Sequence, residues 1–153
     1  MGSEMCIRDS AISLLVGIVI VFGAAAVNGI MTPLVWLVAL VAMLVNAARE
    51  IVKDIEDQVG DADRETLPKQ VGADRARAIA QLLILCSLLP LVAPYARGLL
   101  PMGLLILQAP AMVVLVWIKP RLYRGEDHAA QKSLRLAMLL GLAGFLATVL
   151  IAA

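Results

Sequence analysis

Long apolar stretches dominate this sequence. Residues 11–27, 34–45, 76–93, 98–118 and 133–153 consist mainly of Leu, Val, Ile and Ala. A helix of about 20 apolar residues crosses the hydrocarbon core of a bilayer, and the period-two alternation of a membrane barrel is absent. We therefore predict an all-α, polytopic membrane bundle with five transmembrane helices.

The composition supports this class and narrows the partners. Hydrophobic residues make up 61% of the chain and charged residues 16%, whereas soluble domains have about 45–50% apolar and about 25% charged residues. The net charge is +1, so no strong field favours nucleic acid as a partner. The spacing of Cys6 and Cys86 fits neither a disulfide framework nor a zinc site, and the lone His128 is predicted to be a surface loop residue.

The first ten residues differ from everything that follows. Met1–Ser10 lacks the apolar centre and the cleavage site of a signal peptide. The string resembles translated adapter sequence, so we interpret it as a non-native leader and assign residues 11–153 to the membrane domain.

The distribution of Lys and Arg predicts the orientation. The connection between the second and third spans carries Arg49, Lys53, Arg64, Lys69, Arg75 and Arg77, and the predicted loop from Lys119 to Lys132 with its flank carries Lys119, Arg121, Arg124, Lys132 and Arg135. The connections on the other side contain only Arg97. Because short cytoplasmic loops are enriched in these residues, we expect a multi-pass protein of the cell membrane with both charged connections in the cytoplasm and the C-terminus outside.

The second span turns acidic before its helix ends. Eight of the twelve acidic residues lie between Glu50 and Asp74. Asp54, Asp57 and Asp61 are separated by three and four residues, which places them on one face of a helix. Glu50 extends this acidic stripe by one turn.

Carboxylates at this spacing repel one another unless a cation lies between them. Magnesium fits, because it binds carboxylates together with water and substrate phosphate. Four nearby cations are candidate phosphate contacts, namely Lys53, Arg49, Arg64 and Lys69. A simpler interpretation is a solvated helix face whose acids form ordinary surface ion pairs. Spacing alone leaves both interpretations open.

A longer motif favours the magnesium interpretation. The stretch Asn46–Gly72, NAAREIVKDIEDQVGDADRETLPKQVG, resembles the second aspartate-rich motif of the UbiA superfamily of intramembrane prenyltransferases. The likeness is closest to the archaeal digeranylgeranylglyceryl phosphate synthases, in which a REIVKDIED-like helix leads through GD to TLP and a glycine. The segment Ser133–Leu146, SLRLAMLLGLAGFL, is similar to the last helix of that group.

The resemblance implies a nine-helix fold in which two aspartate-rich motifs hold magnesium around a prenyl diphosphate. It makes Asp54, Asp57 and Asp61 the catalytic, metal-binding residues and matches Lys53 to the lysine beside them. Glu65 departs from the pattern, because a basic residue often precedes TLP. The first motif, NDxxDxxxD, has no counterpart here. We therefore expect this chain to correspond to helices five to nine and to be inactive without the missing N-terminal helices.

The implied reaction is the Mg²⁺-dependent transfer of a geranylgeranyl group from its diphosphate to the free hydroxyl of geranylgeranylglyceryl phosphate. A relative that prenylates an aromatic ring in quinone, tocopherol, chlorophyll or haem synthesis is the first alternative, because the metal site does not identify the acceptor. A non-enzymatic small membrane protein with a cation-binding acidic loop is the second. Magnesium-dependent binding of a prenyl diphosphate separates the enzymes from this last class.

Overall fold

The computed structural model describes the backbone at residues 3–27, 32–57 and 66–152, and side chains from Ser10 onward. Its elements are α1 (Ser3–Ala26), α2 (Pro33–Asp57), α3 (Leu67–Val71), α4 (Ala73–Ala96), the 3₁₀ helix η1 (Met102–Gln108), α5 (Ala109–Trp117), α6 (Lys119–Tyr123) and α7 (Asp127–Ala152). These described ranges contain no strand. The predicted all-α class is confirmed.

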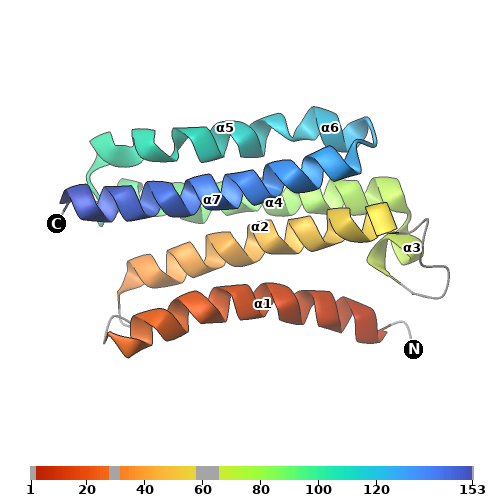
Figure 1. Ribbon diagram of the computed structural model, residues 1–153, viewed down its shortest axis with the longest axis horizontal. Coiled ribbons are helices and arrows are strands. Elements are labelled where there is room, and N and C mark those ends of the chain that lie inside the picture. Colours follow the sequence, from red (N-terminus) through yellow and green to blue (C-terminus); the bar gives the residue numbers. More distant parts are fainter. Residues whose placement is uncertain (1–2, 28–31, 58–65, 153) are drawn as a thin grey trace.

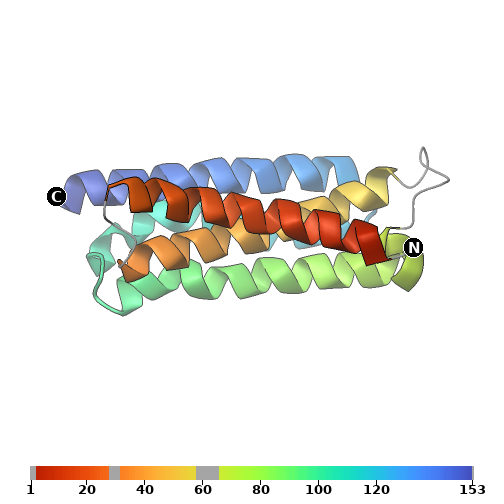
Figure 2. The ribbon, with the colours of Figure 1, turned by 90° about the horizontal axis from the view of Figure 1, so that it is seen from below.

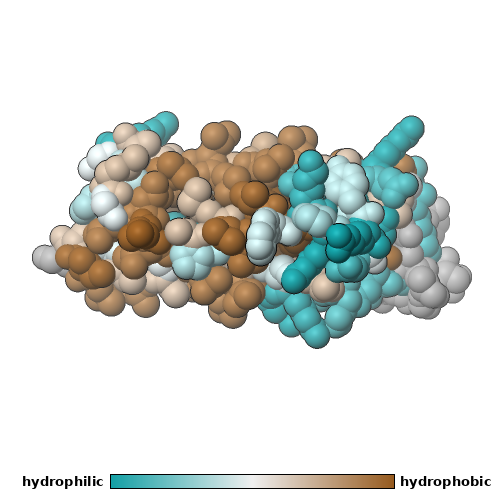
Figure 3. Space-filling model, turned by 90° about the horizontal axis from the view of Figure 1, so that it is seen from above, coloured by the Kyte–Doolittle hydropathy of each residue, from teal (hydrophilic) through white to brown (hydrophobic). Residues whose placement is uncertain are grey.

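The long helices lie side by side in an elongated bundle (Figures 1 and 2). Helix α2 is central and packs against α1, α4 and α7, while α5 lies on the far side of α7. Both charged connections meet at one end, and the C-terminus lies at the other (Figure 1). Apolar residues cover most of the length in Figure 3, and hydrophilic residues gather at the end with the charged connections.

Within the described residues, four helical stretches are long and apolar enough to cross a membrane: Pro33–Asp57, Ala73–Ala96, Met102–Tyr123 and Asp127–Ala152. The first predicted span corresponds to Ser10–Ala26, a shorter apolar helix. Helix α1 itself begins at Ser3, so helical backbone extends into the segment that we left out of the fold. Whether that segment is native stays a prediction.

The fourth predicted span, residues 98–118, lies largely within the helical stretch Met102–Tyr123, which is long and apolar enough to cross a membrane, but one regular α-helix over this range is wrong. The span consists of η1 followed by α5. Pro110 lacks the N–H that would bond the carbonyl of Ile106 in a continuous α-helix, and its ring crowds that carbonyl. The tighter 3₁₀ turn before Pro110 avoids this conflict.

The predicted loop from Lys119 to Lys132 is also wrong, since α6 occupies residues 119–123 and α7 starts at Asp127. Asp127 suits the first turn of a helix because its charge complements the helix dipole. The residues that follow it include good helix formers such as Ala129 and Lys132. The turn itself is confined to the residues around Gly125, whose φ is +73°.

Small residues bring the helices close together. Fully or almost fully buried alanines occur on four helices, namely Ala48, Ala76, Ala80, Ala111, Ala130 and Ala137. They alternate with large buried side chains such as Ile84, Leu91 and Leu134. Small residues allow close backbone approach in membranes, where dispersion contacts replace the hydrophobic effect as the driving force between helices.

Candidate active site at the acidic end of α2

The last turns of α2 place the predicted acids in different environments. Asp54 is buried, with 8% of its surface exposed, whereas Asp57, three residues later, is exposed. Asp61 and Arg64, the other predicted site residues of this segment, lie outside the described residues. The structure therefore describes two of the three predicted metal ligands, on one helix end next to α3.

Glu50 is held by neighbouring cations. Arg49 Nη1 lies 2.9 Å from Glu50 Oε1, and Lys53 Nζ lies 4.0 Å from Glu50 Oε2. Glu50 is buried, and a buried charge is stable only when it is paired. Glu50 therefore forms ion pairs with cations of its own helix, as the simpler interpretation expects, but it is buried rather than on a solvated face.

Arg49 retains an unused donor. Its Nη1 also bonds Asn46 Oδ1 at 3.4 Å, and Asn46 Nδ2 donates to Ser13 Oγ of α1 at 3.4 Å. The Nε of Arg49 and the Oγ1 of Thr66, at the N-terminus of α3, are both buried and have no hydrogen-bond partner among the described residues. Buried polar groups are normally paired, so these two atoms are candidate contacts for phosphate oxygens.

The chemistry of the described donors fits magnesium, although the described residues form no group of three His, Cys, Asp or Glu side chains that could hold a metal. Magnesium needs only one or two protein carboxylates when a substrate phosphate and water complete its coordination. Asp54 and Asp57 could supply these two. Lys53, with 46% of its side chain exposed, and Lys69, exposed on α3, are the neighbouring cations.

One long-range ion pair and one long-range hydrogen bond fasten α7 to this end of the bundle. Arg77 of α4 makes a two-point contact with Asp127 of α7, with Nε–Oδ1 at 3.1 Å and Nη2–Oδ2 at 2.7 Å. His128 Nδ1 lies 2.7 Å from Glu56 Oε1 of α2. His128 is exposed, as predicted, but it belongs to the first turn of α7 rather than to a loop. The sequence offered one signal that these residues meet: both charged connections were predicted on the same side.

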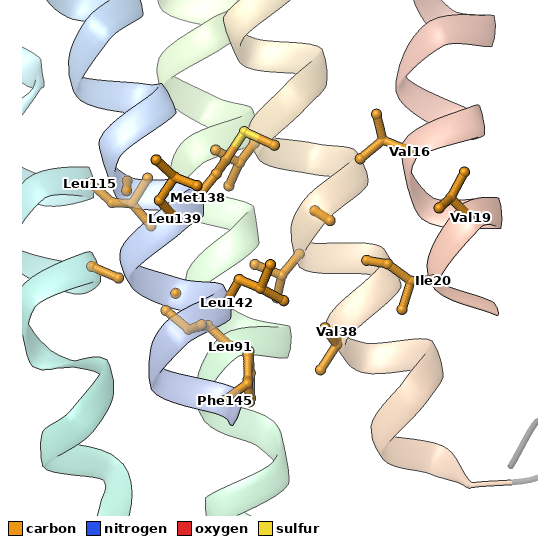
Figure 4. A pocket seen from close by; sticks show the side chains of 16 residues that line it. Val16, Val19, Ile20, Val38, Leu91, Leu115, Met138, Leu139, Leu142 and Phe145 are labelled. Carbon is orange, nitrogen blue, oxygen red and sulfur yellow. The ribbon is translucent and has the colours of Figure 1, made fainter. Parts of the chain in front are cut away.

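An apolar cavity of about 400 Å³ lies between α1, α2, α4, α5 and α7 (Figure 4). Val38 and Val45 line it on α2, and Leu142 lines it on α7. Asp54 follows Val45 by nine residues, which is about two and a half helical turns. The buried aspartate therefore lies on the side of α2 opposite the cavity, and composition alone gave no hint of this separation.

Sequence comparisons place these features in a family. The model of the UbiA prenyltransferase family matches residues 5–143. Proteins named digeranylgeranylglyceryl phosphate synthase are similar to the chain: that of Methanopyrus kandleri is 39% identical over 94% of this chain and 54% of its own length, and that of Thermococcus kodakarensis is 34% identical over 92% and 51%. That of Halobacterium salinarum is 35% identical over 90% of this chain and 49% of its own length.

The chain spans about half the length of the curated relatives that it matches. No solved structure gives a significant match. The family model covers well over half of the chain and includes the whole acidic end of α2. The chain therefore belongs to the UbiA prenyltransferase family.

Proposed function

We propose that this chain contributes the second acidic motif of an enzyme that transfers a geranylgeranyl group from its diphosphate to the hydroxyl of geranylgeranylglyceryl phosphate. The observation that carries the proposal is the acidic end of α2, where Asp54 and Asp57 lie beside Arg49 and Lys53 at the polar end of an apolar bundle. The names of the relatives support the lipid acceptor over an aromatic one.

In this proposal Asp54, Asp57 and Asp61 would hold Mg²⁺, which would supply positive charge to stabilise a departing diphosphate. Phosphate oxygens accept hydrogen bonds from Lys53, Arg49, Arg64 and Lys69, with the unpartnered Nε of Arg49 as the most sharply defined donor. The acceptor hydroxyl then attacks C1 of the prenyl group as the diphosphate leaves.

The same proposal sets the orientation. Both charged connections lie at one end of the bundle (Figure 1), and the enrichment of Lys and Arg there supports the proposal that this end faces the cytoplasm. A water-soluble diphosphate headgroup would then reach Asp57 and Lys53 from the cytoplasmic side. The cavity of Figure 4 is not assigned to the transferred chain, because it lies on the other side of α2 from Asp54.

The test is a transfer assay with labelled geranylgeranyl diphosphate in membranes. A chain extended to the length of the relatives should label geranylgeranylglyceryl phosphate in the presence of Mg²⁺ and should not label an aromatic acceptor such as 4-hydroxybenzoate. Residues 1–153 alone should give no transfer. Labelling of the aromatic compound instead would move the protein to the alternative branch, and transfer by residues 1–153 alone would contradict the requirement for the first aspartate-rich motif, which this chain lacks.

A further inference from the structure

A second pocket lies at the charged end of the bundle, away from the acidic end of α2. This groove of about 490 Å³ runs between α5, α6 and α7, and none of its lining residues belongs to α2. The part of the groove nearer the middle of the bundle is apolar and includes Val113 and Leu136. The part at the charged end contains Arg121 and Arg124. Val113 and Arg121 are eight residues apart, which corresponds to about 12 Å along a helix. The groove is therefore polar at one end and apolar at the other.

Neither arginine of the groove forms an ion pair within the described part of the chain. Arg121 Nη1 donates to Ser133 Oγ, and Ser133 Oγ in turn donates to the carbonyl of Ala129 at 2.8 Å. This chain of contacts fixes one edge of the Arg121 guanidinium. Arg124 is exposed and has no side-chain partner within the described part of the chain, and Glu126, which also lines the groove, forms no ion pair with either arginine there.

The groove lies where the bundle meets the headgroup region. Trp117 lines it, ends α5 and has 78% of its surface exposed. Next along the chain, Lys119 Nζ lies 5.9 Å from the centre of the exposed Tyr123 ring. Exposed Trp and Tyr beside Lys and Arg are typical of the interface between hydrocarbon and water. In Figure 3 the hydrophilic surface begins over this end of the molecule.

We propose that this groove is a binding site for an anionic membrane phospholipid. Its phosphate would accept hydrogen bonds from Arg121 and Arg124, and one of its chains would lie along Trp117, Val113 and Leu136. The charge argues for an anionic lipid, because two guanidinium groups face one carboxylate, Glu126. This site is separate from the proposed diphosphate site and does not depend on catalysis.

The experiment uses lipids with brominated chains, which quench the fluorescence of an indole that they touch. The chain contains two tryptophans, so Trp36→Phe leaves Trp117 as the reporter. The protein is placed in vesicles of phosphatidylcholine with increasing brominated phosphatidylglycerol, and in a parallel series with brominated phosphatidylcholine. We expect phosphatidylglycerol to quench Trp117 at clearly lower mole fractions, and equal quenching by the two lipids would overturn the proposal.

Matched variants separate a site from a general surface charge. Arg124→Gln should weaken the preference for phosphatidylglycerol by about fivefold, the usual contribution of one cation near a membrane surface. Arg75→Gln removes the same charge from an exposed position at the same end, outside the groove, and should leave the preference unchanged. Equal losses in both variants would mean that the arginines serve only membrane topology, which contradicts a site.

Two further measurements test which kind of molecule binds in the groove. Glu126→Gln should strengthen the preference for phosphatidylglycerol, because it removes the only negative charge of the groove lining. A preference for phosphatidylethanolamine that Glu126→Gln abolishes would instead identify a zwitterionic lipid and overturn the assignment. Millimolar inorganic phosphate should not relieve the quenching. Relief by phosphate would show a site for the free anion rather than for a lipid.

Discussion

The two ends of the bundle differ in how completely their polar side chains are hydrogen-bonded. At the apolar end, Gln108, Tyr95 and Thr148 are buried and bond one another. Gln108 donates to Tyr95, Tyr95 donates to Thr148, and Thr148 donates to the carbonyl of Gly144. The order follows because Thr148 has a single proton. Only Gln108 Oε1 of this set lacks a partner within the described residues.

At the charged end the ion pairs of Glu50 and Asp127 are closed, but other polar groups of the candidate site have no such partner among the described residues. Lys53 is about half exposed, Asp57 is exposed, and the buried Nε of Arg49 and Oγ1 of Thr66 have no described partner. A continuous chain of hydrogen bonds between helices stabilises one helix arrangement, whereas donors and acceptors without a partner are available to a ligand. The comparison teaches that paired polar groups stabilise the bundle, whereas the polar groups left without a described partner at the charged end belong to the candidate site.

The largest expected effect is at the charged end. In a chain of the relatives' length, Asp54→Ala or Asp57→Ala should lower geranylgeranyl transfer roughly a hundredfold or more, because electrostatic stabilisation of a leaving group usually contributes that much. Labelled product per amount of inserted protein is the measurement. Asp74→Asn is the control, because Asp74 is fully exposed and lies on α4. Unchanged turnover in both aspartate variants would refute the metal-binding role.

The ion pair between Arg77 of α4 and Asp127 of α7 should contribute mainly to the stability of the fold. Asp127→Ala leaves Arg77 with only the exposed Asp74, and removal of one partner from a mostly buried ion pair costs about 2–3 kcal/mol. Unfolding in detergent micelles, followed by circular dichroism, measures this loss. Glu126→Ala, one residue earlier and without an ion pair among the described residues, is the control. Equal stability of the two variants would show that the ion pair between Arg77 and Asp127 contributes nothing to the free energy of unfolding.

At the apolar end, Gly144→Ala tests the close approach of η1 to α7. A Cβ at this position would lie 2.7 Å from the carbonyl oxygen of Leu107 and 3.0 Å from the side chain of Gln108. Overpacking of this kind destabilises by about 1–3 kcal/mol. Gly23→Ala meets nothing within 4 Å and should keep or raise stability because alanine favours helix. A stable Gly144→Ala protein would contradict the packing of η1 on α7.

The smallest effect is expected for Tyr95→Phe. The ring still stacks on Phe145, with centroids 6.3 Å apart, but the hydroxyl that links Gln108 to Thr148 is lost. Hydrogen bonds inside membrane proteins contribute about 0.6 kcal/mol on average and at most about 1.7. A double-mutant cycle with Thr148→Val measures the coupling. A coupling of zero would mean that these groups are neighbours without mutual stabilisation.

The sequence predicted the membrane bundle because apolar runs of sufficient length have few other stable structures. It also predicted that the helix of the second span continues into the acidic segment, as α2 does to Asp57. The positions at which the helices are interrupted were harder to predict. Apolar character alone predicts one span over residues 98–118 and does not show the change from η1 to α5 near Pro110, and the polar residues after Lys119 predict a loop. Polarity separates water from lipid, but it does not separate helix from loop.

The candidate site was predicted in its residues more than in its geometry. The REIVKDIED pattern identified the acidic motif, and the family match includes it. The pairing of Glu50 with Arg49 and Lys53 depends on rotamers that spacing cannot give. The contact of Glu56 with His128 joins residues 72 positions apart, so no local pattern contains it. The side of α2 that faces the apolar cavity could be read only after α1 and α7 were in place.

The most direct test of the central claim is calorimetric titration of a relative-length protein in micelles with geranylgeranyl diphosphate, with and without Mg²⁺. The account predicts saturable binding that requires the metal and is lost in the Asp54→Ala, Asp57→Ala double variant. Binding of the diphosphate that is equally tight without Mg²⁺, or that survives the loss of both aspartates, would contradict it.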